Sequence, residues 1–315
     1  MSYIREQLPY TLDAFEGEEL GERYKGKVRE NFHAGDEIIM VTTDRVSAFD
    51  HVLGTIPFKG QILTEIANFW FEKTKDIAPN HIISYPDPQV LVAKKAETLP
   101  VEVIVRGYIT GSLWREYEQG INGQYGFMLP EGLKKDQKFD TPILTPSTKA
   151  EYGEHDEPIA REAIVNGLVE ESVYAKAESY ALALFAAGQE WAARQGLILV
   201  DTKYEFGMVN GELIVIDEIH TPDSSRYWIA DEYEAHFNKG EGQKMLDKEN
   251  IRQWLIERGF SGEGTPPALT DEIRVALAES YIELYTKLTG RDFHPKLGDV
   301  KSRIENNLEK AGIYA

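Results

Sequence analysis

Charged residues stand inside an apolar, strand-like stretch at 197–228, and their spacing suits phosphate and metal chemistry. Asp201, Lys203 and Glu205 alternate along the first apolar run, so the two-residue period of a strand places all three on one face. Asp217 ends a second apolar run further along. Carboxylates on neighbouring strands suit Mg²⁺, which takes one or two carboxylates together with phosphate oxygens and water. A lysine between the carboxylates suits a phosphate.

An Asn210-Gly211 pair between the two apolar runs is typical of a two-residue hairpin turn. A strict two-residue turn would leave Asp217 on the face opposite Glu205. For these two carboxylates to share one metal ion, the register must shift by one residue, through a three-residue loop or a bulge at Gly207. We predict that shift.

The alternative interpretation of this hairpin is a solvated edge, in which acids and lysine are paired for solubility. The runs LILV at 197–200 and LIVI at 213–216 are typical of central strands instead. Charges at the ends of central strands usually serve a ligand. The sequence therefore favours a ligand site.

Composition bounds the class of protein. The chain has 315 residues, 42% of them apolar, which is enough for two or three lobes with a buried core. It contains no cysteine, so oxygen or imidazole must hold any metal. A net charge of −19 argues against nucleic-acid partners and an anionic-membrane surface, although a few cations in one cleft can bind a small anion.

The N-terminal sequence lacks the layout of a signal peptide, and no apolar run approaches the length of a membrane span. We therefore expect a cytoplasmic protein without a membrane partner. The sequence leaves a monomer and a small homo-oligomer both open.

Cations also alternate around a glycine near the N-terminus, where Lys27 and Arg29 lie in YKGKVRENF. One interpretation is a turn that lays cations and backbone N–H groups over phosphates. The other is a polar edge strand. The motif matches neither a P-loop nor a GxGxxG pattern, so the residues alone leave both open.

Arg106 follows an apolar run in a predicted strand at 101–110 and needs a partner if it is buried. A salt bridge to Glu102, on the same face, is one solution. A phosphate is the other, because Gly111 and Ser112 follow at once and allow an anion to approach the backbone. The two interpretations stand equal on the residues alone.

Residues 118–160 are rich in glycine and proline, and a segment of this length is more often a functional loop than a spacer. It carries Lys149, His155 and Asp156, which could be a surface group or a site. A core helix is predicted at 173–191, and further helices follow residue 228.

Several of these segments closely resemble blocks of the SAICAR synthetase (phosphoribosylaminoimidazole-succinocarboxamide synthase) family. Two signatures stand intact, LPVEVIVRGYITGS at 99–112 and LVDTKYEFG at 199–207. Four further blocks follow the family's order, namely GKVRENF, PFKGQILTEIANFWF, LTPSTKAEYGEHDEPI and DEIHTPDSSRYW. The resemblance spans nearly the whole chain, and several unlinked motifs in order are far more specific than one.

The resemblance implies an ATP-dependent ligase of purine biosynthesis that joins L-aspartate to carboxyaminoimidazole ribonucleotide and releases ADP and phosphate. A carboxylate is a poor electrophile, so ATP first converts it to an acyl phosphate, which the aspartate amine then attacks. Such chemistry depends on positioning and on charge neutralisation by Mg²⁺ and cations. ATP and Mg²⁺ are the implied cofactors, and the partners are small molecules.

For the nucleotide, the resemblance implies that Glu205 and Asp217 bind the metal and that Lys203 contacts the ATP phosphates. Lys27 and Arg29 resemble the loop that covers those phosphates.

For the second substrate, Arg106, Ser112 and Arg226 resemble the group that holds its 5′-phosphate, and Asp201 resembles the aspartate that meets the nucleotide ribose. Asp156 is the candidate to accept a proton from the attacking ammonium, and with Lys203 and Arg226 it completes the expected catalytic set. Four further residues in matching blocks are expected to line the substrate cleft: Ser47, Asp50, Lys59 and Gln61.

The implied fold is α+β. An N-terminal antiparallel β lobe at 1–110 would cover ATP, as in protein kinases and ATP-grasp enzymes. A mixed α/β lobe with a central sheet at 111–260 would carry the hairpin, and a helical segment at 261–315 would pack on the core. The alternatives are a small-molecule kinase of related fold and a catalytically inactive nucleotide-binding homologue.

Overall fold

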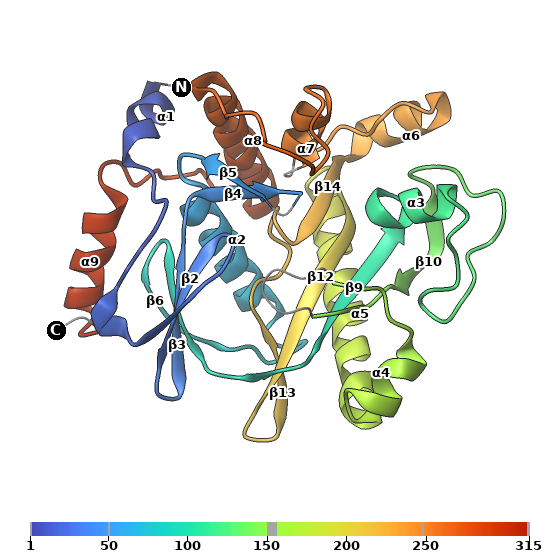
Figure 1. Cartoon of the computed structure of the whole chain (residues 1–315), viewed down its shortest axis with the longest axis horizontal. Coiled ribbons are helices and arrows are strands. Elements are labelled where there is room, and N and C mark those ends of the chain that lie inside the picture. Colours follow the sequence, from blue (N-terminus) through green and yellow to red (C-terminus); the bar gives the residue numbers. More distant parts are fainter. Residues whose placement is uncertain (1, 50, 150–155, 247–248, 314–315) are drawn as a thin grey trace. The chain divides into compact units, whose positions relative to one another are not determined.

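The computed structural model describes residues 2–49, 51–149, 156–246 and 249–313, which form helices and antiparallel sheets (Figure 1). The expected α+β class is confirmed. The chain forms two compact units. Unit 1 comprises Met1–Phe69, His81–Lys95 and Leu246–Ala315, and unit 2 comprises Trp70–Asn80 and Ala96–Met245.

Unit 1 contains a five-stranded antiparallel sheet in the order β1-β2-β3-β7-β6. Its strands are β1 (Glu22–Lys25), β2 (Arg29–Ala34), β3 (Glu37–Thr42), β6 (Ile82–Asp87) and β7 (Val90–Lys94). A two-stranded sheet pairs β4 (Arg45–Ala48) with β5 (His51–Thr55). The N-terminal part of the chain is therefore antiparallel β structure, as expected.

Helices from both ends of the chain belong to unit 1. They are α1 (Ser2–Gln7), η1 (Leu8–Tyr10), η2 (Glu18–Leu20), α7 (Glu249–Ile256), α8 (Asp271–Thr289) and α9 (Val300–Lys310), while α2 (Lys59–Thr74) begins in unit 1 and ends in unit 2.

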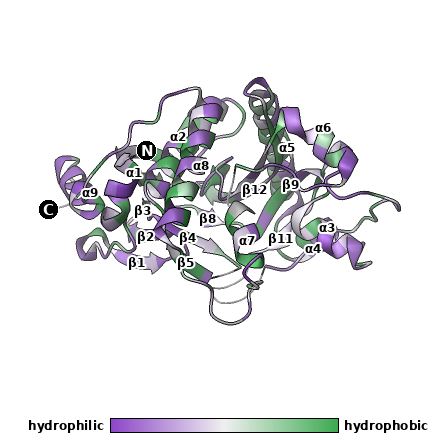
Figure 2. Cartoon of the chain, turned by 90° about the horizontal axis from the view of Figure 1, so that it is seen from above, coloured by the Kyte–Doolittle hydropathy of each residue, from purple (hydrophilic) through white to green (hydrophobic). Residues whose placement is uncertain are grey.

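The last helix, α9, completes the core of unit 1. Val300, Ile304 and Leu308 recur at four-residue spacing and form one buried stripe. This stripe packs in one cluster with apolar residues of the sheet, among them Phe32 and Val41. The rest of α9 is mostly hydrophilic (Figure 2), and its side chains are half-buried or exposed.

Unit 2 is built on an antiparallel sheet with the order β10-β9-β12-β13, extended by β8 and β14 on β12 and by β11 on β9. Its strands are β8 (Glu97–Thr98), β9 (Val101–Tyr108), β10 (Lys138–Leu144), β11 (Ser147–Thr148), β12 (Leu197–Val209), β13 (Glu212–Ile216) and β14 (Ser225–Ile229). Its helices are α3 (Gly111–Glu118), α4 (Arg161–Gly167), α5 (Glu171–Arg194) and α6 (Ala230–Lys239).

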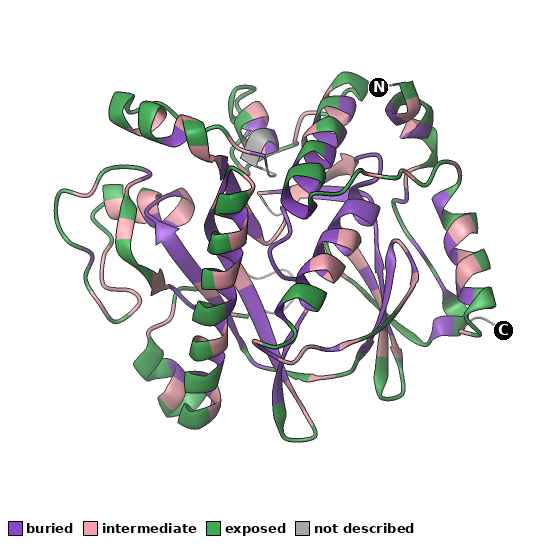
Figure 3. Ribbon diagram, turned by 180° about the vertical axis from the view of Figure 1, so that it is seen from behind, coloured by how far each residue is buried: buried purple, intermediate pink, exposed green. Residues whose placement is uncertain are grey.

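The predicted core helix is α5, which packs against β12 and β9 (Figure 1). Its buried residues recur every three or four positions, among them Ala177, Leu184 and Gly188. Figure 3 shows buried strands beside this helix, whose own residues alternate between buried and exposed. The helix thereby covers one face of the sheet and leaves the other face to the charged residues.

The two units differ from the three-part division expected at residues 110 and 260. β9 belongs to unit 2, where its residues from Val103 to Arg106 pair with β12. The helices of 261–315 belong to unit 1, where α9 packs on the sheet.

The register of the β12–β13 hairpin corrects one prediction. Asn210 (φ 51°) and Gly211 (φ 81°) both adopt the left-handed conformation that a two-residue type I′ turn requires. Strict pairing continues from Val209↔Glu212 to Glu205↔Ile216, so the predicted one-residue shift is wrong. The ladder ends there, because Asp217 turns to φ 66°. The strict alternation of faces therefore no longer governs Asp217.

Among the described residues, none of the helices has both the length and the apolar content needed to cross a membrane.

Candidate active site

One face of β12 and β9 carries the charged residues predicted from the sequence. Asp201 pairs with Arg106 of β9 on one side and with Arg226 of β14 on the other. Next along β12, Lys203 pairs with Ile104, and the face then reaches Glu205. The predicted alternation is therefore confirmed.

A bulge in β12 sets this face. Leu199 pairs with Tyr227 and Asp201 with Arg226, so Val200 is an extra residue in the ladder with β14. The extra residue turns Asp201 to the face opposite Leu199. Leu199 contacts α5, since a methyl group on Gly188 would lie 2.6 Å from its side chain. The bulge thus separates the apolar packing of β12 from its charged face.

The arginine cluster, defined as Arg106, Ser112, Asp201 and Arg226, lies at one end of this face. The guanidinium groups of Arg106 and Arg226 donate to the same Asp201 oxygen, Oδ2, at 3.2 Å and 2.5 Å. Arg106 also donates to Ser112 Oγ at 3.2 Å and to Thr145 Oγ1 at 2.8 Å. Two cations against one carboxylate leave a local excess of positive charge, which suits a phosphate.

Burial lowers the pKa of Arg106, and the charge of Asp201 opposes that shift. Of the two interpretations of Arg106, the salt bridge to Glu102 is not the pairing observed, because Arg106 pairs with Asp201 and Glu102 with Lys203. The phosphate interpretation stays a prediction. Gly111 begins α3 with φ 60°, and a methyl group there would lie 2.3 Å from the Arg226 guanidinium. Only glycine lets Arg226 lie this close to the start of α3.

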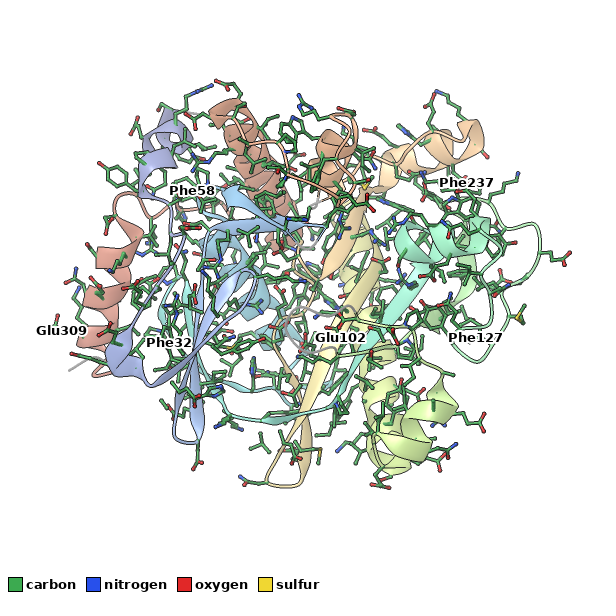
Figure 4. The ribbon with its side chains drawn as sticks, viewed as in Figure 1. Phe32, Phe58, Glu102, Phe127, Phe237 and Glu309 are labelled. Carbon is green, nitrogen blue, oxygen red and sulfur yellow. The ribbon has the colours of Figure 1, made fainter. Side chains whose placement is uncertain are left out.

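The lysine cluster, defined as Lys203, Glu205, Glu102 and Lys149, lies further along the same face. Lys203 Nζ donates to Glu102 Oε1 at 2.7 Å and also to Glu205. Lys149 donates to the other oxygen of Glu205. Figure 4 labels Glu102, which belongs to β9.

The lysine cluster is strongly coupled by charge. Burial would lower the pKa of Lys203, but the charges of Glu205, Glu102 and Asp217 outweigh it and raise that pKa well above its usual value. Burial would raise the pKa of Glu205, but Lys203 and Lys149 hold it well below its usual value. Lys203 is therefore a permanent cation and Glu205 a permanent anion at neutral pH.

Asp217 and Asp156 lie near this cluster. The charge of Asp217 acts on Lys203, and that of Asp156 helps burial to raise the pKa of Glu102. Asp156 itself is exposed. Its neighbour His155 falls outside the described residues, as does Asp50.

The remaining candidates belong to unit 1, and their roles stay predictions. Lys27 lies in the turn between β1 and β2, Arg29 is the first residue of β2, and Ser47 lies in β4. Lys59 and Gln61 begin α2 and are buried, with Lys59 Nζ 5.8 Å from the centre of the Tyr281 ring. Gln61 donates to Glu65 and to the backbone oxygen of His294.

The structure adds three residues that the sequence did not assign to a site. Glu102 and Lys149 belong to the lysine cluster, and Thr145 accepts from Arg106 of the arginine cluster. Glu102 could have been found from its shared face with Arg106. Lys149 and Thr145 lie in the glycine- and proline-rich segment, which has no period that would reveal the direction of a side chain.

A family model described as SAICAR synthetase matches residues 22–267. The chain belongs to the SAICAR synthetase family. A phosphoribosylaminoimidazole-succinocarboxamide synthase of Bacteroides fragilis is 51% identical over 291 residues, which cover 90% of this chain and 93% of that protein. The Cytophaga hutchinsonii synthase is 50% identical, covering 91% and 94%.

Solved structures of the SAICAR synthetase family share this fold. The SAICAR synthase of Saccharomyces cerevisiae, complexed with SAICAR, has a TM-score of 0.79 and 32% identity, and the match covers 90% of this chain and 99% of that one. A SAICAR synthetase in complex with ADP has a TM-score of 0.66 and 26% identity, covering 87% and 100%. The expected activity, an ATP-dependent ligase of purine biosynthesis with ATP and Mg²⁺ as cofactors, is confirmed.

The residues around Lys203 fit a magnesium ion. Within the described ranges, no group of three or more acids or histidines is arranged as a ready metal site. Mg²⁺ needs fewer protein ligands, because it keeps several waters and takes its other ligands from phosphates. Glu205 and Asp217 could supply the one or two carboxylates required, once Lys149 releases the Glu205 oxygen that it contacts.

Proposed function

We propose that the charged face of β9, β12 and β14 is where this chain joins L-aspartate to carboxyaminoimidazole ribonucleotide. The supporting observation is that the arginine cluster and the lysine cluster lie apart along one face of β12, and that each can bind a different anionic group. A strand rises about 3.3 Å per residue, so Asp201 and Glu205 stand about 13 Å apart. The imidazole nucleotide carries a phosphate at one end and its reactive carboxylate at the other, which matches two separate sites.

The arginine cluster holds the 5′-phosphate of the imidazole nucleotide in this proposal. Arg226, with 18% of its side chain exposed, is the more accessible guanidinium, and Arg106 is almost covered. The planar guanidinium groups can each donate two hydrogen bonds to phosphate oxygens. Asp201 fixes both of them and remains placed to accept from a ribose hydroxyl.

The lysine cluster handles the ATP phosphates. Glu102 and Glu205 fix the position of Lys203 Nζ, and the ammonium neutralises charge as the γ-phosphoryl group moves. Mg²⁺, when bound by Glu205 and Asp217, supplies further positive charge to the phosphates. Lys149, which donates to Glu205 in this structure, would then be available as a second cation for the phosphates.

The reaction proceeds in two displacements. A carboxylate oxygen of the imidazole nucleotide attacks the γ-phosphorus, and ADP leaves. The aspartate amine attacks the carbonyl carbon of the acyl phosphate, and the carbon–oxygen bond to phosphate breaks. Asp156, whose charge reaches Glu102, is the proposed acceptor of the ammonium proton. The monomeric or small oligomeric state and the cytoplasmic location remain predictions.

Oxygen-18 in the substrate carboxylate tests this chemistry. Because the attacking oxygen stays with phosphorus when the carbon–oxygen bond breaks, we expect one labelled oxygen in each inorganic phosphate, measured by mass spectrometry. Unlabelled phosphate would overturn the acyl phosphate route. Omitting L-aspartate is the control, since a small-molecule kinase would then accumulate a stable phosphorylated product.

A further inference from the structure

A buried arginine lies beneath the turn that carries Lys27. Arg45 begins β4 in unit 1, and only 2% of its side chain is exposed. Its Nε donates to the backbone oxygen of Lys27 at 2.9 Å. One of its terminal nitrogens donates to the backbone oxygens of Gly26 and Arg29 at 2.9 Å and 3.3 Å. A single guanidinium thus binds three of the four carbonyl groups from 26 to 29.

The fourth carbonyl of this turn is held by the residue two positions before Arg45. Thr43 donates to the backbone oxygen of Val28 twice, from its Oγ1 at 2.7 Å and from its own backbone nitrogen at 2.9 Å. The Gly26 nitrogen closes the turn by donating to the Arg29 oxygen at 2.9 Å. Every carbonyl group of the turn therefore has a fixed partner within unit 1.

The charge of Arg45 is balanced inside the same unit. Its remaining nitrogen donates to Glu30 Oε1 at 2.6 Å and to the backbone oxygen of Asp13 at 2.5 Å. Glu30 is fully buried and also accepts from Arg23. Five hydrogen bonds from one buried side chain, four of them to backbone oxygens, exceed what neutralising Glu30 requires.

The direction of these carbonyl groups fixes the direction of the neighbouring amides. In a planar trans peptide the N–H points opposite to the C=O, and the described residues contain no cis peptide bond. The oxygens of Gly26 and Lys27 point at Arg45, so the N–H groups of Lys27 and Val28 point away from it. This is the arrangement with which a turn presents amides to an anion.

We infer that Arg45 is a positioning residue for the ATP reaction, which fixes the turn at 26–29 so that its amides and Lys27 meet the phosphates. The inference rests on the predicted role of Lys27 and Arg29 as the phosphate-covering loop, which the resemblance to the family implies. Arg45 acts through the shape of the turn, without touching the nucleotide.

Arg45→Lys tests the inference, because lysine keeps the charge opposite Glu30 and loses the fork that binds three carbonyl groups. We expect KM for ATP to rise by roughly tenfold, the equivalent of one lost charge-assisted hydrogen bond. KM for L-aspartate and for the imidazole nucleotide should stay within about twofold of the parent values. A general loss of stability would not change KM for ATP selectively in this way.

Arg303→Lys is the matched control. Arg303 is another forked arginine of unit 1, and it donates to both oxygens of Asp87 at 3.0 Å and to Gln89. Its partners lie outside the turn at 26–29. We expect this variant to lower the melting temperature and leave KM for ATP unchanged. An equal rise of that KM in both variants would overturn the inference.

Two further variants keep the outcome decisive. Thr43→Val removes one hydrogen bond to Val28 at constant shape and should raise KM for ATP by about threefold, even if Arg45→Lys does not fold. Lys27→Ala tests the loop itself. If KM for ATP rises in Lys27→Ala but stays normal in both Arg45→Lys and Thr43→Val, the inference about Arg45 is overturned while the role of the loop stands. Normal ATP use in Lys27→Ala would overturn the proposed role of the loop and the inference with it.

Discussion

At the scale of single residues, Gly111 sets the position of Arg226. We expect Gly111→Ala to raise KM for the imidazole nucleotide at least tenfold, because the new methyl group would displace the guanidinium from Asp201. KM for ATP should change little. Gly120→Ala is the control, since Gly120 also has a positive φ (77°) but open space around it. Equal kinetic losses in both variants would point to backbone strain alone.

A second residue, His220, carries a prediction about acid stability. It is fully buried, its Nε2 contacts Tyr204 Oη at 2.5 Å, and burial lowers its pKa to about 3. The unfolded chain binds a proton near pH 6.5 and the folded chain does not, so stability falls as the pH drops from 6.5 towards 3. For this residue the loss is about 2 kcal/mol between pH 7 and pH 5.

The variant His220→Gln keeps a polar partner for Tyr204 and does not titrate. Urea unfolding of both proteins at pH 7 and pH 5 isolates the histidine, because all other titrating groups are shared. We expect the variant to lose less stability than the parent over this interval. Parallel losses in the two proteins would mean that His220 takes up its proton equally in the folded and the unfolded chain.

At the scale of elements, the end of β13 determines where Asp217 lies. Asn tolerates the left-handed backbone at this position, whereas a β-branched residue does not. Asp217→Asn should therefore fold normally, while the Mg²⁺ concentration for half-maximal activity rises several-fold. Asp217→Val should in addition lose about 1–3 kcal/mol of unfolding free energy. An unchanged Mg²⁺ requirement in the Asn variant would remove Asp217 from the metal site.

The same strand end shows what the sequence could and could not predict. The alternation of Asp201, Lys203 and Glu205 and the hairpin at Asn210-Gly211 follow from local rules, and both are predicted from the sequence. The register shift was wrong because it assumed that Asp217 still belongs to the ladder. A left-handed residue after a strand is a matter of local backbone geometry that the hydrophobic pattern does not encode.

Pairing between distant strands was equally hidden from local patterns. Arg106 and Arg226 flank Asp201 because β9 and β14 pair with β12, over separations that no periodicity reveals. The bulge at Val200 then turns Asp201 towards them. The resemblance to the family grouped Arg106, Ser112 and Arg226, and the structure shows that they lie together around Asp201. The structure also adds Glu102 and Lys149 as contacts of Lys203 and Glu205.

At the scale of the whole molecule, unit 1 depends on the last helix of the chain. Ile304 is fully buried in the stripe of α9 that packs on the sheet. We expect Ile304→Ala to cost about 2–5 kcal/mol, through lost burial and the cavity left behind. Guanidinium unfolding measures this cost, and Glu305→Ala, on the same helix, is the partly exposed control. A cost below about 1 kcal/mol would show that the α9 stripe is not part of the core of unit 1.

The dependence of unit 1 on α9 also affects how the protein folds during synthesis on the ribosome. Strands of unit 1 that are made early in translation cannot bury their apolar side chains against α9 until α9 has left the exit tunnel. A chain truncated before α9 would therefore contain every residue of the charged face but an uncovered sheet in unit 1, which chaperones and proteases would recognise.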